Sequence, residues 1–202
     1  MEYYRNLPHF QPLESVFFIT IRLAGSLPVV TIEMLKEEQK MALNQVSQEP
    51  KEVVNQKKRY FARFDEALDK PQNGPYWLKE KELASIVTEA LHFRDKLDYI
   101  LVAYCLMSNH VHFVIDTREA IEMHKPLFRI LQSFKRYTAQ KANVILNRTG
   151  AFWHPESYDH LVRDNGELRS VIWYVTQNPV KACLCKVWTE WPYSYVNEGY
   201  LV

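Results

Sequence analysis

Two histidines, His110 and His112, are the residues best suited to chemistry, and Val111 separates them. The segment around them is apolar and β-branched, which favours a strand over 110–116. Alternate side chains of a strand point to the same face, so both imidazoles are expected on one face. Two imidazoles placed in this way form half of a metal site. A pair of surface histidines is the alternative, which a three-residue pattern alone would favour.

A second pair, Tyr174 and Asn178, lies four residues apart in a segment with helical periodicity. Residues at this spacing lie one above the other on a helix. The Asn178 amide oxygen could complete a metal site with the histidines, and the Tyr174 phenol would then face whatever the metal holds. Such a site leaves positions for water and phosphate oxygens, which suits Mg²⁺ or Mn²⁺. The alternative is a half-buried core tyrosine and an asparagine that caps the helix before Pro179.

The elements that must position these residues follow from the hydrophobic pattern. Continuous apolar runs predict strands, apolar positions at helical spacing predict amphipathic helices, and Pro179 is expected to end the last helix. The expected elements are a strand at 16–24, two helices within 31–70, a helix at 77–93, strands at 99–107 and 110–116 joined by a tight turn, a helix at 124–146, a strand at 157–163 and a helix at 166–177. Their order is the split βαβ, or ferredoxin-like, pattern of an α+β fold. We expect one domain over 1–202 with a helical insertion at about 28–72.

The net charge of the 202-residue chain is only +1, which by itself argues against a nucleic-acid-binding protein. The charge is uneven, however, because residues 51–63 carry +4 and residues 118–148 carry +5. Basic blocks of this kind attract phosphate. On the helix at 124–146, the cations that face away from the apolar side are Lys125, Arg129 and Arg136. They are predicted to follow a DNA backbone, and a solvated helix face is the alternative.

The remaining composition narrows the class of protein. A 47% hydrophobic content is enough for a real core and excludes a disordered tail. Cys105, Cys183 and Cys185 contain no CxxC pair, which argues against a disulfide framework or a structural zinc site. We find no signal peptide and no apolar run of about 18 residues. The sequence therefore predicts a soluble, cytoplasmic protein with no membrane partner.

Three segments of the chain together resemble the signature blocks of one protein family. They are CLMSNHVHFVI (105–115), GAFWHPESYDHLVRD (150–164) and YVTQNPVKA (174–182). In order and spacing they are similar to the REP-associated tyrosine transposases, which belong to the single-tyrosine HUH transposases of insertion sequences. HUH stands for His, bulky hydrophobe, His, matched here by residues 110–112. The family's YIxxNP pattern is matched by residues 174–179, with Val175 in place of Ile.

The resemblance implies the HUH endonuclease fold, with an antiparallel central sheet, helices on one face and a C-terminal catalytic helix. It implies a metal-dependent enzyme of DNA transposition and recombination that nicks and rejoins single-stranded DNA beside a hairpin. Tyr174 would be the nucleophile that forms a 5′-phosphotyrosine, and His110, His112 and Asn178 would bind Mg²⁺ or Mn²⁺. The implied partners are single-stranded or hairpin DNA with REP-like palindromes, bound by a monomer or a homodimer. Bases could stack on aromatic side chains such as Tyr3, Tyr4, Phe10 or Trp153.

Two other functions fit parts of the pattern. One is a catalytically silent DNA-hairpin-binding protein of the same fold, against which the intact metal and tyrosine residues count. The other is a structural or RNA-binding ferredoxin-like domain, which is expected to expose aromatic side chains on its sheet. Tyr137, in the basic segment FKRYTAQ, is a second candidate nucleophile, although its place at the edge of an apolar helix face favours packing in the core.

Overall fold

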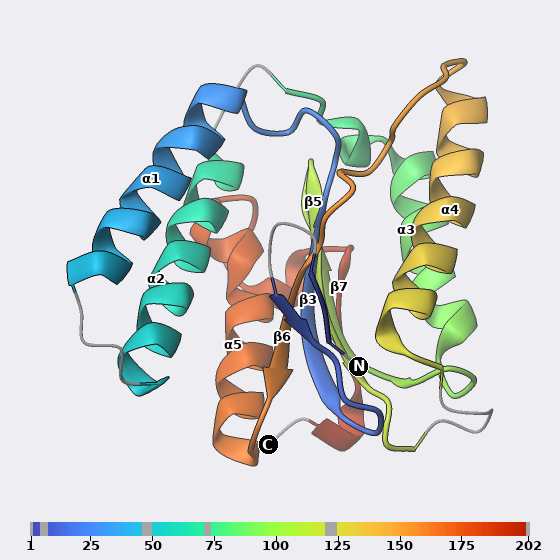
Figure 1. The fold of residues 1–202 in the computed structure, drawn as a ribbon. Helices are drawn as coiled ribbons and strands as arrows, with labels where there is room; N and C mark the ends of the chain where they lie inside the picture. Colours follow the sequence, from blue (N-terminus) through green and yellow to red (C-terminus); the bar gives the residue numbers. More distant parts are fainter. Residues whose placement is uncertain (1, 5–7, 46–49, 71–73, 120–124, 201–202) are drawn as a thin grey trace. The chain divides into compact units, whose positions relative to one another are not determined.

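The structure is a computed structural model that describes residues 2–4, 8–45, 50–70, 74–119 and 125–200. The chain forms two compact units (Figure 1). The sheet unit combines Met1–Ala24 with Tyr76–Val202, and the helical unit is Gly25–Pro75. A single domain with an insertion at about 28–72 stays a prediction. Within the described ranges, every helix is too short or too polar to cross a membrane.

The sheet unit is built around an antiparallel sheet with the spatial order β6-β3-β5-β4-β7. Its strands are β3 (Val16–Arg22), β4 (Ile100–Leu106), β5 (His110–Asp116), β6 (Tyr158–Val162) and β7 (Ser194–Val196). The spatial order of β3, β4, β5 and β6 in this sheet is the one expected of the ferredoxin-like pattern. The predicted α+β fold is therefore confirmed. A separate two-stranded sheet joins β1 (Glu2–Tyr4) to β2 (Pro8–Phe10). Neither β1, β2 nor the edge strand β7 was predicted from the sequence.

Two helices, α3 (Lys81–Arg94) and α4 (Leu127–Ile145), cover one face of this sheet (Figure 1). The main core lies beneath them and includes the alternate β5 residues Val111, Phe113 and Ile115. The ring centres of Phe113 and Phe134 are 5.9 Å apart. The α4 side chains in this core are Leu127, Ile130, Leu131, Phe134 and Ala142. Ile145, expected on the same apolar face, is 39% exposed because it lies at the end of the helix.

The opposite face of the sheet is covered by α5 (Asn165–Lys181) (Figure 1). Its first turn is capped by Asp164, whose carboxylate accepts a hydrogen bond from the Glu167 amide at 2.8 Å. The prediction that Pro179 ends this helix was wrong, since α5 continues to Lys181. A proline in the last turn removes only one main-chain donor. The next amides still bond, with Ala182 N donating to the Asn178 carbonyl at 3.0 Å.

Three short 3₁₀ helices complete the sheet unit: η1 (Trp77–Lys79), η2 (Trp188–Glu190) and η3 (Glu198–Tyr200). The C-terminal segment that contains η2 and β7 is held against β4. Trp191 donates its indole N–H to the Leu106 carbonyl at 3.0 Å, and the Leu106 amide donates to the Tyr193 carbonyl at 2.9 Å. These bonds hold the aromatic segment KVWTEWPYSY (186–195) against β4.

The helical unit contains α1 (Val29–Gln45) and α2 (Pro50–Asp69). The sequence predicted two helices here with a break at Pro50, and Pro50 is the first residue of the second helix. Proline is favoured at that position because the first amides of a helix have no partner within it. The two helices share a small core of Leu27, Leu35, Ala67 and Leu68.

Candidate functional site

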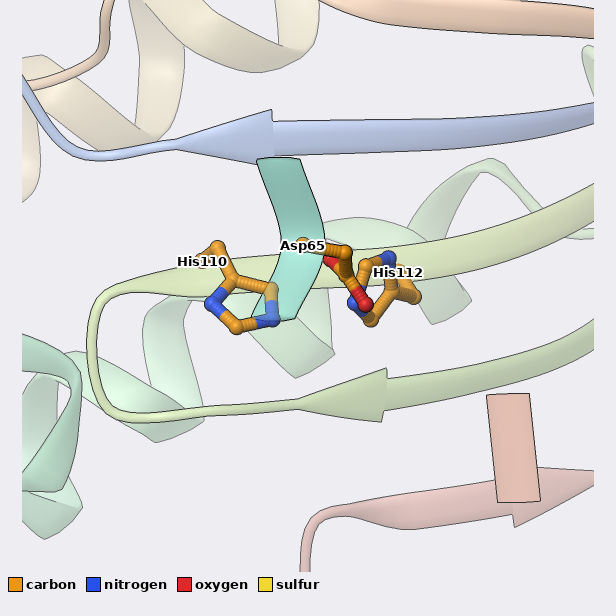
Figure 2. Close-up of side chains that lie close together, drawn as sticks. All are labelled: Asp65, His110 and His112. Atoms are coloured by element: carbon orange, nitrogen blue, oxygen red, sulfur yellow. The ribbon is translucent and has the colours of Figure 1, made fainter. Parts of the chain in front are cut away.

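The two histidines of β5 lie on the same face of the strand, as predicted. Their ring centres are 4.6 Å apart, and a nitrogen of each ring lies within 4.8 Å of a nitrogen of the other. Figure 2 shows both rings beside β5; its third labelled side chain, Asp65, comes from α2 in the helical unit. The sheet unit by itself therefore supplies a close pair of imidazoles on the α5 side of the sheet.

Hydrogen bonds at Nδ1 define how each imidazole can bind a metal. His110 Nδ1 lies 2.7 Å from Asn109 Oδ1, and an amide oxygen only accepts, so Nδ1 carries the proton. His112 Nδ1 lies 2.8 Å from Thr20 Oγ1 on the neighbouring strand β3. With Nδ1 engaged in each ring, Nε2 is the nitrogen left to act as a metal ligand. Metal-binding histidines usually have such a second partner, which fixes the ring and its tautomer.

Tyr174 of α5 lies against His112 of this histidine pair. Its ring centre is 5.8 Å from that of His112 and 5.8 Å from that of Phe18 on β3, with edge-to-face geometry in both cases. Phe18 also stacks on His112 at 5.8 Å. The rings of Phe18 and His112 both contact the Tyr174 side chain, so the structure brings the tyrosine that the sequence singled out against His112.

Another tyrosine, Tyr158 on β6, also lies near this group. Its ring centre is 6.1 Å from that of Phe18. Burial, followed by the nearby charges of Asp159 and Glu167, raises the pKa of Tyr158 well above its ordinary value. A phenol that resists ionisation is a poor nucleophile. Tyr158 is therefore poorly suited to attack a phosphate.

Asn178 lies one turn after Tyr174 and is buried. Its side-chain amide donates back to the Tyr174 carbonyl at 3.3 Å. The bond uses the nitrogen of the amide and leaves Oδ1 as the atom that could bind a metal. The expected alternative, a helix-capping asparagine, is wrong because α5 continues for three residues beyond Asn178.

The three cations predicted to bind DNA differ in their surroundings. Arg129 and Arg136 are exposed on α4, whereas Lys125 precedes that helix. Lys125 Nζ lies 2.6 Å from a carboxylate oxygen of the buried Asp98, which also pairs with Arg94 at 2.7 Å. Because α4 packs on the sheet face opposite to α5, these cations lie across the sheet from Tyr174. Any phosphate they bind is therefore remote from the histidine pair.

Several other predictions can be compared with the structure. Trp153 is buried and donates its indole N–H to Thr138 Oγ1 at 2.8 Å, so stacking of bases on it is excluded. Tyr137 is 49% exposed, and the prediction that it packs in the core was wrong. The side chains of Tyr3, Tyr4 and Phe10 lie outside the part of the chain whose side chains the structure describes.

Sequence reasoning missed two residues beside Tyr174. Trp173 is 60% exposed on α5. Lys181 Nζ lies 4.8 Å from the centre of the Tyr174 ring and 5.5 Å from that of Trp173. Both residues could have been found from their positions on the helix. Trp173 falls outside the apolar face of α5, and Lys181 is two turns after Tyr174. Lys181 lies beyond residue 177, where the sequence predicted that the helix ends.

Comparisons with known proteins identify the class to which this site belongs. The chain matches the family described as "Transposase IS200 like" over residues 76–178, which is about half of its length and includes both histidines, Tyr174 and Asn178. The chain therefore belongs to the IS200-like transposases.

Two individual proteins resemble the chain more specifically. A REP-associated tyrosine transposase of Haemophilus influenzae is 28% identical over 101 residues, which cover 46% of this chain and 56% of that protein. The matched part of the chain thus spans about half the length of that relative. A solved REP-associated tyrosine transposase bound to a REP hairpin has a TM-score of 0.54 and 14% identity, and the match covers 96% of this chain and 82% of that one. The similarity of fold and the resemblance to REP-associated tyrosine transposases are both confirmed.

Proposed function

We propose that the protein is a metal-dependent endonuclease and strand transferase that acts on single-stranded DNA beside a hairpin, with Tyr174 as its nucleophile. The observation that carries this proposal is the position of the Tyr174 ring 5.8 Å from that of His112, within a site built by β3, β5 and α5. Membership of the IS200-like transposases supports the choice of DNA as the substrate.

The proposed reaction exchanges one phosphoester for another. The Tyr174 oxygen attacks the scissile phosphorus in line, a bond from that oxygen to the 5′-phosphate forms, and the bond from phosphorus to the 3′ oxygen breaks. The proton lost by the phenol is balanced by the one that the released 3′ oxygen gains. Because a phosphoester is conserved, a 3′-hydroxyl can later attack the phosphotyrosine and rejoin the strand without ATP.

The residues of the site fit a divalent cation. Nε2 of His110, Nε2 of His112 and Oδ1 of Asn178 would hold it, with open positions for water and phosphate oxygens. A bound Mg²⁺ or Mn²⁺ would polarise the scissile phosphate and offset the charge that develops on its oxygens. Thr20 and Asn109 would orient the two imidazoles through their Nδ1 atoms.

The hairpin itself is proposed to bind on α4. Arg129 and Arg136 are exposed there and are suited to contact phosphates, while phosphate contacts fix the position of a duplex without reading its sequence. Lys125 was predicted to join them, but its ion pair with Asp98 also gives it a structural role. The hairpin of the solved relative supports this class of partner.

The test is formation of a covalent adduct with Mn²⁺ and single-stranded oligonucleotides taken from the DNA around the protein's own gene. We expect Tyr174→Phe to abolish the adduct on a denaturing gel while hairpin binding is retained. Tyr137→Phe is the matched control, because Tyr137 is exposed in a basic segment across the sheet, and it should leave the adduct intact. An adduct that persists in Tyr174→Phe would refute the assignment of the nucleophile.

The same experiment separates the proposal from a catalytically silent hairpin-binding protein. In that case the wild-type protein binds the hairpin but forms no adduct with either metal, and Tyr174→Phe changes nothing. The present site argues against such a loss, because the two imidazoles, their Nδ1 partners and the tyrosine are all in place.

A further inference from the structure

The exposed side of α5 carries aromatic and cationic side chains that the proposed reaction does not use. Trp173 presents a largely exposed indole directly before Tyr174. Lys181 Nζ lies near both rings, 4.8 Å from the Tyr174 centre and 5.5 Å from the Trp173 centre. The exposed indole offers a flat face on which another ring can stack.

Beyond Trp173, the surface is hollowed into an open groove of about 560 Å³. The groove runs between α5 and the C-terminal segment, and its lining includes Arg169, Trp173, Thr176, Trp188 and Tyr200. Its volume lies within the range of about 300–1,000 Å³ found for small-molecule sites, so it can receive a nucleotide base.

The helix geometry makes these features continuous. Arg169 is four residues before Trp173, so the two side chains lie one above the other on α5. Trp173 is rotated by about 100° from Tyr174 around the helix axis. A path therefore leads from Tyr174 past Lys181 to Trp173 and Arg169, and then into the groove beside Trp188.

The charge of the path favours a polyanion. Arg169 and Lys181 are exposed cations. Burial, together with the nearby Asp116, raises the pKa of the Tyr200 phenol to about 12, so this tyrosine adds no negative charge at neutral pH. The Asp116 carboxylate that accepts its hydrogen bond at 3.0 Å is itself paired with Arg118 at 2.6 Å.

We propose that this exposed face of α5 binds the unpaired DNA strand that flanks the scissile phosphate, with a base stacked on Trp173 in the groove and phosphates beside Lys181 and Arg169. The inference rests on the proposed function, because it assigns a binding site to the strand that Tyr174 would cut. Alternating aromatic and cationic groups are the usual surface for single-stranded nucleic acid, since every base has a face that can stack. The exposed cations beside the aromatic side chains also complement a phosphate backbone, which argues for DNA over a partner without negative charge.

The test compares two DNA probes: a hairpin taken from the region around the protein's own gene, and the same hairpin with a tail of about eight deoxythymidines, a length typical of single-strand sites. The tail is attached at either the 5′ or the 3′ end, and the affinity of each probe is measured by fluorescence anisotropy. The tail should strengthen binding by wild-type protein, and Trp173→Ala should remove about 5- to 150-fold of that gain. Arg169→Gln should reduce the salt slope of tail binding by about 0.7 for the loss of one phosphate contact.

Phe93→Ala is the matched control, because Phe93 is a 74% exposed aromatic residue on α3, across the sheet. It should leave the gain from the tail unchanged. Retention of that gain in Trp173→Ala, or an equal loss for tailed and untailed hairpins, would overturn the inference. So would a change of oligomer mass in Trp173→Ala, because it would identify the face as a protein interface. If wild-type protein forms no adduct and binds neither probe, the proposed function fails instead.

Discussion

Replacing Thr20 with valine tests whether β3 prepares His112 to bind a metal. The two residues are directly paired across β3 and β5, and the Thr20 hydroxyl lies 2.8 Å from His112 Nδ1. Valine has nearly the same shape as threonine and is a strong strand former, so β3 should be retained. The substitution removes the hydroxyl and leaves His112 Nδ1 without this hydrogen-bond partner.

The expected effect has two parts. Loss of the hydrogen-bond partner of a buried polar group costs about 1–3 kcal/mol, which should lower the free energy of unfolding in metal-free buffer. Removal of such a partner from a metal-binding histidine typically weakens metal affinity by about 10- to 100-fold. That range corresponds to about 1.4–2.7 kcal/mol of binding free energy.

Calorimetric titration of the protein with Mn²⁺ measures the second effect, and urea unfolding without metal measures the first. Thr88→Val is the control, because the Thr88 hydroxyl bonds only within α3, to the Ala84 carbonyl at 3.2 Å and the Ser85 carbonyl at 3.1 Å. The control should keep wild-type Mn²⁺ affinity. If Thr20→Val folds and binds Mn²⁺ within twofold of wild type, the proposed metal site at His112 is refuted.

Two further predictions concern other parts of the sheet unit. Arg136→Gln should lower the slope of log affinity against log salt for a DNA hairpin by about 0.9, because one phosphate contact is lost, and thermal unfolding should not change; a shifted melting temperature with an unchanged slope would contradict this. Burial alone would raise the pKa of Asp116, but hydrogen bonds from Arg118 outweigh it and hold the pKa below its ordinary value. The stability that Asp116 contributes is therefore present above about pH 4 and lost as pH falls through its folded-state pKa. Arg118→Gln should flatten this acid-side loss in melting curves between about pH 3 and pH 6, and an unchanged curve would count against the ion pair.

Much of the fold could be predicted because its elements are long and periodic. The strand 110–116 was predicted with its bounds, since a tight turn and a continuous apolar run define it. The side on which each candidate residue lies followed from two local patterns: alternation along a strand places His110 and His112 on one face, and the i to i+4 spacing places Tyr174 and Asn178 one above the other on a helix. The direction of a side chain within a strand or helix depends only on nearby residues, so a single sequence is enough to predict it.

What could not be predicted depends on contacts between distant segments. The strand β7 has only three residues and exists because it pairs with β4, which lies about ninety positions earlier in the chain. The continuation of α5 past Pro179 depends on amides of residues 182 and 184 that complete its last turn. Both faces of β5 carry buried side chains, so the pattern of this strand could not indicate which helix would cover the histidines.

The separation of α4 and α5 by the sheet has a consequence for the proposed activity. If the same cations bound both the hairpin and the strand to be cut, the protein would bind any DNA that reached the active site. Here α4, which carries Arg136, lies on one side of the sheet, while α5, which carries Tyr174 and Trp173, lies on the other. Substitutions on the two surfaces should therefore have nearly additive effects on binding, because no contact is shared. Cleavage would then require a DNA molecule with a duplex and an unpaired strand placed to reach both surfaces. A net charge of only +1 is compatible with this selectivity, since basic segments such as 118–148 are offset by acidic residues elsewhere in the chain.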